Sequence, residues 1–209
     1  MKIQRLSPLS VLPSLVLANV IFVCLALLAL PAFAQDPPEA LRPPKGAQIA
    51  IVVFEDLQCP RCGLLAPLLA QASRDYKIPL VQHDFPLPMH NWSYEAAVLA
   101  RYFDTHSKET GNDFRAAVFA HQIEIVPQNL RAFAEKFAAE RKITLPFVVD
   151  PNGKLAALVN ADRELGKGLN LLHTPTIYVV SSKRGGRPYV EVNEPQTQLF
   201  ALIDAMKKE

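Results

Sequence analysis

The apolar positions of the chain predict two strands and a helix at the start of its folded part. Residues Ile49 to Phe54 form a short, continuous apolar run with several β-branched side chains, which is typical of a strand buried on both faces. Leucines and alanines then follow with a helical spacing between residues 64 and 72. A second strand is predicted from Ile78 to Phe85. Strand, helix and strand within about 37 residues form a βαβ unit, in which the two strands run parallel.

The pattern becomes helical from Asn91 to about Gly168. Within this block, Gly111-Asn112-Asp113 predicts a break between two helices. Two apolar stripes with helical spacing predict that the helices bury one face. The stripes consist of Trp92, Ala96, Leu99 and Phe103, and of Leu130, Phe133, Ala134, Phe137 and Ala138.

The last part of the chain changes character again. Thr176 to Val180 is rich in strand-forming residues, Lys183 to Gly186 is typical of a turn, and Pro188 to Val192 predicts a further strand. Apolar residues at helical spacing between 199 and 206 then indicate a closing amphipathic helix. The predicted order is therefore βαβ, a helical block and ββα, which is an α/β arrangement.

The first 34 residues have the features of a signal peptide. Lys2 and Arg5 give a positive start, a mostly apolar stretch follows through Leu30, and residues 31–34 supply an A-x-A cleavage motif. We predict cleavage after Ala34 and export to the periplasm or another compartment outside the cytoplasm. An uncleaved membrane anchor is the alternative, although the apolar stretch is shorter than the roughly 20 residues of a membrane span. Residues 35–47 are rich in proline and are predicted to be a lead-in to one domain at 48–209.

Charge and cysteine content limit the classes of function that fit the sequence. The sequence contains 22 basic and 20 acidic residues. Because two basic residues and no acidic residue lie in the signal segment, the exported chain is formally neutral, which argues against nucleic-acid binding. Of the three cysteines, Cys24 lies in the same segment, so Cys59 and Cys62 remain as one CxxC pair. In an oxidising compartment, such a pair indicates redox catalysis more than a structural disulfide.

The motif Cys59-Pro60-Arg61-Cys62 lies between the first predicted strand and the first predicted helix. Cys59 is expected at the helix cap and Pro60 at the first helical position, where a missing N–H costs nothing. Unpaired N–H groups and the helix dipole favour a thiolate there, so we expect Cys59 to be the nucleophile and Cys62 the resolving thiol. Arg61 is the nearest positive charge in sequence. Thiol–disulfide exchange needs no cofactor. The sequence has no second cysteine pair and no set of histidines at ligand-like spacing, so it does not indicate a metal site.

With these motifs the chain resembles the DsbA-like thiol–disulfide oxidoreductases of the thioredoxin superfamily. The CxxC has that family's Cys-Pro-X-Cys form, and the segment after it, with Pro67, is similar to thioredoxin's active-site helix. Phe85-Pro86-Leu87, His90 and the alanine-rich residues 95–97 resemble the entry to the family's helical insertion. Thr174-Pro175-Thr176, just before the late strand, resembles the superfamily's cis-proline loop.

The resemblance implies an α/β thioredoxin fold, βαβ…ββα, with a helical insertion at about 91–168 between the two halves. It also implies that Pro175 is cis, that His173, Thr174 and Pro175 form a substrate-binding loop, and that Pro60 and Arg61 tune the redox pair. The expected activity is oxidation of reduced or unfolded secreted proteins by a monomer, with a membrane or soluble redox partner restoring the disulfide. A reductase of the same fold stays open as an alternative. A chaperone or peptide-binding module with a dispensable CxxC stays open as well.

Three features depart from the family pattern or compete with it. His173 stands where many relatives have glycine, and the sequence leaves open whether it tunes the thiolate or only fills the loop. Val53 stands six residues before the first thiol, where thioredoxin has a buried acid. Glu55 and Asp56 are candidates for that acid's role, but we predict both to be exposed charges at the end of the strand. A second proline-led segment, at 144–154, competes for the cis-proline loop, although the residues after it have a helical pattern.

Overall fold

The computed structural model describes residues 38–183 and 188–208. The predicted signal peptide at 1–34 lies outside the described residues, as does most of the predicted turn at 183–186. None of the helices in the described ranges is both long enough and apolar enough to cross a bilayer. Within the proline-rich lead-in, the described chain forms a short 3-10 helix, η2 (Glu39–Leu41).

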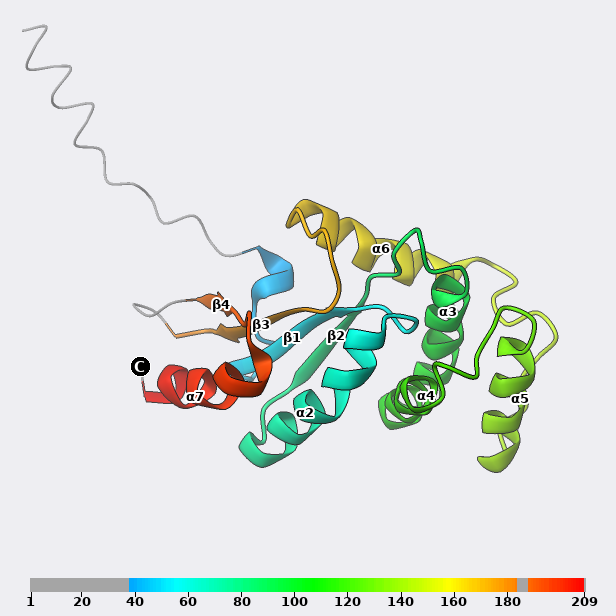
Figure 1. Ribbon diagram of the computed structural model, residues 1–209, viewed down its shortest axis with the longest axis horizontal. Coiled ribbons are helices and arrows are strands. Elements are labelled where there is room, and N and C mark those ends of the chain that lie inside the picture. The colour runs from blue at the N-terminus through cyan, green and yellow to red at the C-terminus, as the bar shows by residue number, and fades with distance from the viewer. Residues whose placement is uncertain (1–37, 184–187, 209) are drawn as a thin grey trace, which may run out of the picture. The chain divides into compact units, whose positions relative to one another are not determined.

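A four-stranded sheet forms the centre of the described fold (Figure 1). Its strands are β1 (Ile49–Glu55), β2 (Leu80–Asp84), β3 (Thr176–Ser181) and β4 (Tyr189–Glu191). They lie in the order β2-β1-β3-β4, with β1 and β2 parallel and the other two neighbouring pairs antiparallel. The βαβ unit and the later hairpin are therefore both present, and the predicted thioredoxin fold class is confirmed.

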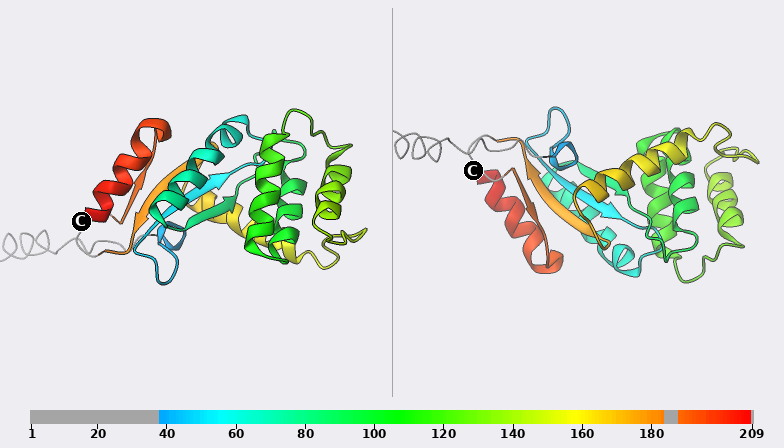
Figure 2. Two further views of the ribbon diagram at one scale, coloured as in Figure 1. Left: turned by 90° about the horizontal axis from the view of Figure 1, so that it is seen from below. Right: turned by 90° about the horizontal axis from the view of Figure 1, so that it is seen from above.

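Helices cover both faces of this sheet (Figure 2). Every residue of β1 is therefore buried. On one face, α2 (Pro60–Tyr76) and α7 (Pro195–Lys208) pack over an aliphatic core. The other face is covered by η2 and by α6 (Lys154–Gly168), which contacts β2. Successive side chains of β1 contribute alternately to the two cores, Val53 to the first and Phe54 to the second. The continuous apolar run thus reflects burial on both sides.

The chain between β2 and β3 contains the helices α3 (Ser93–Asp104), α4 (Lys108–Ala120), α5 (Leu130–Glu140) and α6. Helices α3, α4 and α5 share a core of their own, to which both predicted apolar stripes contribute. Leu57, from the loop after β1, is buried in the same core. The insertion therefore packs directly against the loop that leads to the thiols.

The predicted helix break at residues 111–113 is wrong, because these residues lie inside α4. Gly111 faces the end of α3, where a Cβ atom on it would lie 1.9 Å from Oδ1 of Asp104. The glycine therefore allows α3 and α4 to approach closely instead of ending a helix. The actual turn comes earlier, where the Ser107 hydroxyl caps α4 by accepting a hydrogen bond from the N–H of Thr110 at 3.0 Å.

A cluster of buried charges joins the insertion to the sheet. The Arg115 guanidinium in α4, 1% exposed, donates to both carboxylate oxygens of Asp104 at 2.9 Å. Arg101 in α3 contacts Asp84 at the end of β2 and Asp162 in α6. Asp162 also accepts a hydrogen bond from the N–H of Asp84 at 2.9 Å. Because buried charges are tolerated only when they are paired, this charge cluster ties α3, α4 and α6 to β2 in one arrangement.

Candidate active site

The two thiols of the CxxC motif lie at the amino end of α2. Cys59 is the N-cap residue of this helix, and Pro60 lies in its first turn. Both cysteines are free, and they are 7% and 2% exposed for Cys59 and Cys62 respectively. The Cys62 sulfur accepts a hydrogen bond from the N–H of Asp56 at 3.5 Å. Cys59 is therefore the more exposed residue of the pair, although both are buried.

The surroundings push the pKa values of the two thiols apart. A hydrogen bond from Cys62 is the main cause that lowers the pKa of Cys59 from 9.0 to about 5, and it outweighs the opposing effect of burial. The Thr174 side chain and the backbone N–H groups of Cys62 and Arg61 lower the pKa further. Burial, followed by the hydrogen bond to Cys59, raises the pKa of Cys62. At neutral pH, Cys59 is thus a thiolate, whereas Cys62 stays protonated.

A loop before β3 lies against the first thiol. Its Thr174–Pro175 peptide bond is cis, and the carbonyl oxygen of Thr174 lies 3.4 Å from the Cys59 sulfur. The pairing of β1 with β3 brings this loop to the active end of the sheet, because Phe54 lies opposite Thr176. The competing proline-led segment at 144–154 forms no strand, and α6 begins at its last residue, Lys154.

A pocket of about 340 Å³ opens beside this loop. It is lined by Arg61 from the CxxC motif, by His173, Thr174 and Pro175, and by residues that follow β4. His173 is exposed, and its carbonyl oxygen accepts a hydrogen bond from the Thr176 hydroxyl at 2.9 Å. The structure therefore gathers, around one pocket, the loop residues and the arginine that the sequence indicated separately.

Asp56 is buried, contrary to the prediction that it is exposed. Its carboxylate, in a residue 1% exposed, accepts hydrogen bonds from the N–H groups of Gln58 and Leu87 at 2.7 Å. It also accepts a hydrogen bond from the Ser93 hydroxyl, and Nδ1 of His90 lies 2.7 Å away. These contacts fasten the loop after β1 to the segment between β2 and α3. The Asp56 side chain therefore shapes the active-site loop.

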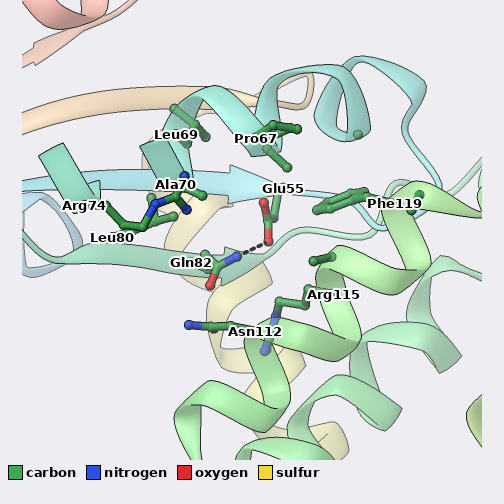
Figure 3. A pocket seen from close by; sticks show the side chains of 14 residues that line it. Glu55, Pro67, Leu69, Ala70, Arg74, Leu80, Gln82, Asn112, Arg115 and Phe119 are labelled. Carbon is green, nitrogen blue, oxygen red and sulfur yellow. Dashed lines mark hydrogen bonds between the residues drawn. The ribbon is translucent and has the colours of Figure 1, made fainter. Parts of the chain in front are cut away.

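Glu55 is buried as well, at 3% exposure, because α4 of the insertion covers this end of β1 (Figure 3). Nε2 of Gln82 donates to its carboxylate at 3.0 Å. Burial raises the pKa of Glu55 from 4.5 to about 7, and the charge of Glu55 contributes to the raised pKa of Cys62. Since side chains alternate along a strand, Glu55 lies on the same face of β1 as Val53. A buried acid is thus present two residues further along than the resemblance to thioredoxin leads one to expect.

Gln122, which the sequence did not single out, connects the insertion to the active-site loop. Its Nε2 donates to the carbonyl oxygens of Leu57 at 2.8 Å and of Cys59 at 3.0 Å. A Cβ atom on Gly63 would lie 2.5 Å from Oε1 of Gln122, so a glycine is needed next to Cys62 for this approach. The small residue directly after the CxxC is the one signal in the sequence that points to such a contact.

Replacing Gln122 with leucine is expected to lower the free energy of unfolding of the reduced protein by about 1–3 kcal/mol, since the Leu57 carbonyl oxygen loses its side-chain donor and the Cys59 carbonyl oxygen keeps only the N–H of Gly63. Urea denaturation followed by circular dichroism measures this change. Gln71→Leu, at an exposed position of α2, is the matched control and is expected to change stability by no more than about 0.5 kcal/mol. Equal stability of the two variants would mean that Gln122 does not hold the active-site loop.

Comparison with curated proteins finds a partial match to a transporter. The Na(+)/H(+) antiporter NhaA 3 of Salinispora tropica is 26% identical over 153 residues, which is 71% of this chain and 22% of that protein. The chain therefore spans less than a quarter of the length of this relative. The name antiporter belongs to that protein over its full length and is not carried over to this chain.

Comparison with solved structures gives the fold. DsbA2 of Pseudomonas aeruginosa superposes with a TM-score of 0.59 and 20% identity, over 78% of this chain and 91% of that chain. For the thiol-disulfide exchange protein alpha-DsbA2 of Wolbachia pipientis, the TM-score is 0.62, the identity 20%, and the coverage 80% and 84%. A periplasmic thioredoxin-like protein from Salmonella enterica serovar Typhimurium gives 0.58 and 16%, over 78% and 84%. The family model described as Thioredoxin matches residues 44–204. The chain therefore belongs to the thioredoxin family, and it has the fold of the DsbA-like thiol–disulfide oxidoreductases.

Proposed function

We propose that this protein is an exported thiol–disulfide oxidoreductase that uses Cys59 and Cys62 to oxidise thiols of secreted proteins. The observation that carries the proposal is the position of two free thiols at the start of α2, with Cys59 at the N-cap beside the cis Thr174–Pro175 loop. This arrangement lowers the pKa of Cys59 and raises that of Cys62. A sulfur with a low pKa, next to a partner that stays protonated, is what thiol–disulfide exchange requires.

The reaction starts from the Cys59–Cys62 disulfide. A substrate thiolate attacks the Cys59 sulfur, the bond between the two cysteines breaks, and Cys62 leaves as a thiolate that takes up a proton. A second substrate thiolate then attacks the substrate sulfur of the mixed disulfide and releases Cys59 as a thiolate. The substrate loses two electrons and gains a disulfide, while the protein gains two electrons and becomes the dithiol.

Glu55 is the group proposed to exchange the proton with Cys62. Its carboxyl group is buried, its pKa of about 7 lies near neutral pH, and its charge acts on the Cys62 thiol. A group with a pKa close to the working pH is best suited to give and take a proton in turn. Asp56 is less suited, since its carboxylate already accepts several hydrogen bonds from the surrounding loop.

The pocket beside the cis peptide is the proposed substrate site. Thr174 lies against Cys59, so an extended substrate segment pairs with the backbone of this loop, with its cysteine directed at the reactive sulfur. Pro175 and His173 form the rest of the loop, and Arg61 faces the same pocket. Pro60 and Arg61, between the two thiols, are proposed to tune the redox pair.

The low pKa of Cys59 favours the oxidising direction. Whatever stabilises the thiolate stabilises the reduced protein, and its disulfide therefore becomes the stronger oxidant. With a pKa of about 5, the thiolate exceeds the thiol about 100-fold at pH 7, which corresponds to roughly 60 mV for a two-electron couple. An oxidase of this kind needs a membrane or soluble redox partner to restore its disulfide. The A-x-A motif at 32–34 supports export to an oxidising compartment, where the protein acts as a monomer.

The experiment compares two assays of the purified protein: oxidation of a reduced, unfolded substrate by the disulfide form, and reduction of insulin by the dithiol form. Wild type is expected to oxidise its substrate, and Cys59→Ser is expected to do neither reaction. A potential against glutathione well above the roughly −270 mV of thioredoxin supports the oxidase, and a value near it favours the reductase. Protection of an unfolded client without any thiol activity in wild type would overturn the proposal in favour of a binding module.

A further inference from the structure

The backbone of Asp56 contacts both residues of the CxxC pair. Its N–H donates to the Cys62 sulfur at 3.5 Å, and its carbonyl oxygen accepts a hydrogen bond from the N–H of Cys59 at 3.0 Å. Burial is the main cause of the raised pKa of Cys62, and the N–H of Asp56 acts against it. The position of this one peptide group therefore affects the surroundings of both thiols.

The side chain of Asp56 is held by four donors. The N–H of Gln58 and the Ser93 hydroxyl donate to its Oδ1. Its Oδ2 accepts from the N–H of Leu87 and from the ring of His90. The Asp56 side chain is 0% exposed, so these donors take the place of water around the carboxylate. Three of the four come from the segment between β2 and the start of α3, which fixes the Asp56 peptide relative to that segment.

His90 is the member of this set that is partly accessible from solvent. Its ring is 20% exposed, and Nδ1 lies 2.7 Å from Oδ2 of Asp56. A carboxylate only accepts hydrogen bonds, so Nδ1 carries the proton in this contact. The backbone N–H of His90 donates to the carbonyl oxygen of Leu87 at 3.0 Å, and this turn brings the Leu87 N–H and the His90 ring to the same carboxylate oxygen.

The N–H of Asp56 has its largest effect when the disulfide is attacked. As a substrate thiolate bonds to the Cys59 sulfur, the bond between Cys59 and Cys62 breaks and its electron pair passes to Cys62, which then takes up a proton. The sulfur that accepts from the Asp56 N–H thus changes from a neutral atom to an anion. Hydrogen bonds to charged acceptors are roughly twice as strong as neutral ones. The contact therefore stabilises the leaving thiolate more than it stabilises the disulfide.

We propose that Asp56 and His90 are positioning residues for thiol–disulfide exchange: their contact holds the Asp56 N–H on the Cys62 sulfur, where it stabilises the thiolate that leaves when Cys59 is attacked. This inference rests on the proposed function and adds to it the residues that prepare the leaving group. Both side chains act through the Asp56 backbone and not on the reacting sulfurs themselves.

The first experiment measures the rate at which reduced glutathione opens the Cys59–Cys62 disulfide of the purified protein, by acid quenching and mass spectrometry. His90→Phe keeps a ring and removes the donor. It is expected to slow this step about tenfold, at the lower end of the roughly 10- to 100-fold that a hydrogen bond to a charged acceptor represents. His90→Asn returns an N–H donor near the position of Nδ1 and is expected to recover most of the rate. His106→Phe, at an exposed position between α3 and α4, is the matched control and is expected to react like wild type.

The second experiment separates positioning of the leaving group from a general loosening of the loop. In Cys62→Ala, iodoacetamide alkylates Cys59 and no thiolate leaves from position 62. Adding His90→Phe to this variant is expected to leave the alkylation rate unchanged, whereas a loosened loop would change it. Equal glutathione rates in wild type and His90→Phe, or an equally large effect of His90→Phe on alkylation, would overturn the positioning role alone. A wild-type disulfide that does not react with thiols would overturn the proposed function, and this inference with it.

Discussion

Alkylation of Cys59 in the reduced protein is expected to titrate with a midpoint near pH 5 in place of the ordinary value of 9.0 for cysteine. The hydrogen bond from Cys62, with smaller contributions from Thr174 and the N–H groups at the start of α2, holds the sulfur as a thiolate. At pH 7, about 99% of Cys59 is then ionised against about 1% of an ordinary cysteine, a roughly 100-fold difference. Rates of alkylation by iodoacetamide, or the ultraviolet absorbance of the thiolate, measure this between about pH 3 and pH 10.

The role of the second thiol can be separated with two variants at position 62. Cys62→Ala removes the donor, and we expect the pKa of Cys59 to rise towards its ordinary value. Cys62→Ser keeps a hydroxyl donor at the same place, so a smaller rise is expected. An unchanged midpoint in Cys62→Ala would contradict the hydrogen bond as the main cause of the low pKa.

Replacing Glu55 with glutamine is expected to stabilise the folded protein by about 3 kcal/mol near pH 8.5, and to leave its stability unchanged near pH 4. Burial raises the pKa of Glu55 from 4.5 to about 7. Between these values the folded state keeps a proton that the unfolded state has released, so the stability of wild type falls as the pH rises through this window. Glutamine has the same shape and cannot ionise, so it avoids the loss. Urea denaturation at the two pH values measures the difference.

Glu95→Gln, at an exposed position of α3, is the matched control and should show no such dependence on pH. The proposed proton transfer adds a kinetic expectation for the same Glu55 variant. The rate at which Cys62 resolves a mixed disulfide should lose its inflection near pH 7. A stability difference that is equal at both pH values would contradict a buried acid with a raised pKa.

The hydrophobic pattern predicts the architecture well where burial is continuous along an element. The run from Ile49 to Phe54 became β1 because both faces of this strand are covered, and the stripe from Leu130 to Ala138 became α5. The pattern fails where packing overrides local preference. Gly111 lies in the first turn of α4, where the neighbouring Asp104 leaves no room for a Cβ atom, and no local signal distinguishes such a glycine from a helix breaker.

Some residues of the candidate site could be predicted from the sequence, and others could not. The CxxC and the Thr174–Pro175 loop are short motifs, and the resemblance to a known family was enough to indicate both. The burial of Glu55 and Asp56 depends on partners 27 to 37 residues away, and Gln122 contacts a carbonyl 63 residues away. Contacts of this range follow from how the insertion packs on the sheet, which a single sequence does not encode in any local pattern.

The charge cluster between the insertion and the sheet limits how such a protein can be recombined. Asp84 belongs to β2, whereas its cations, Arg101 and Arg115, belong to the inserted helices. An insertion from another protein, placed after β2, would leave this carboxylate without its cations. Losing one partner of a buried ion pair costs about 3–5 kcal/mol, and a domain is typically stable by only about 5–15 kcal/mol. An exchange of the inserted helices that keeps this charge cluster intact therefore has to include β2, the strand that ends in Asp84.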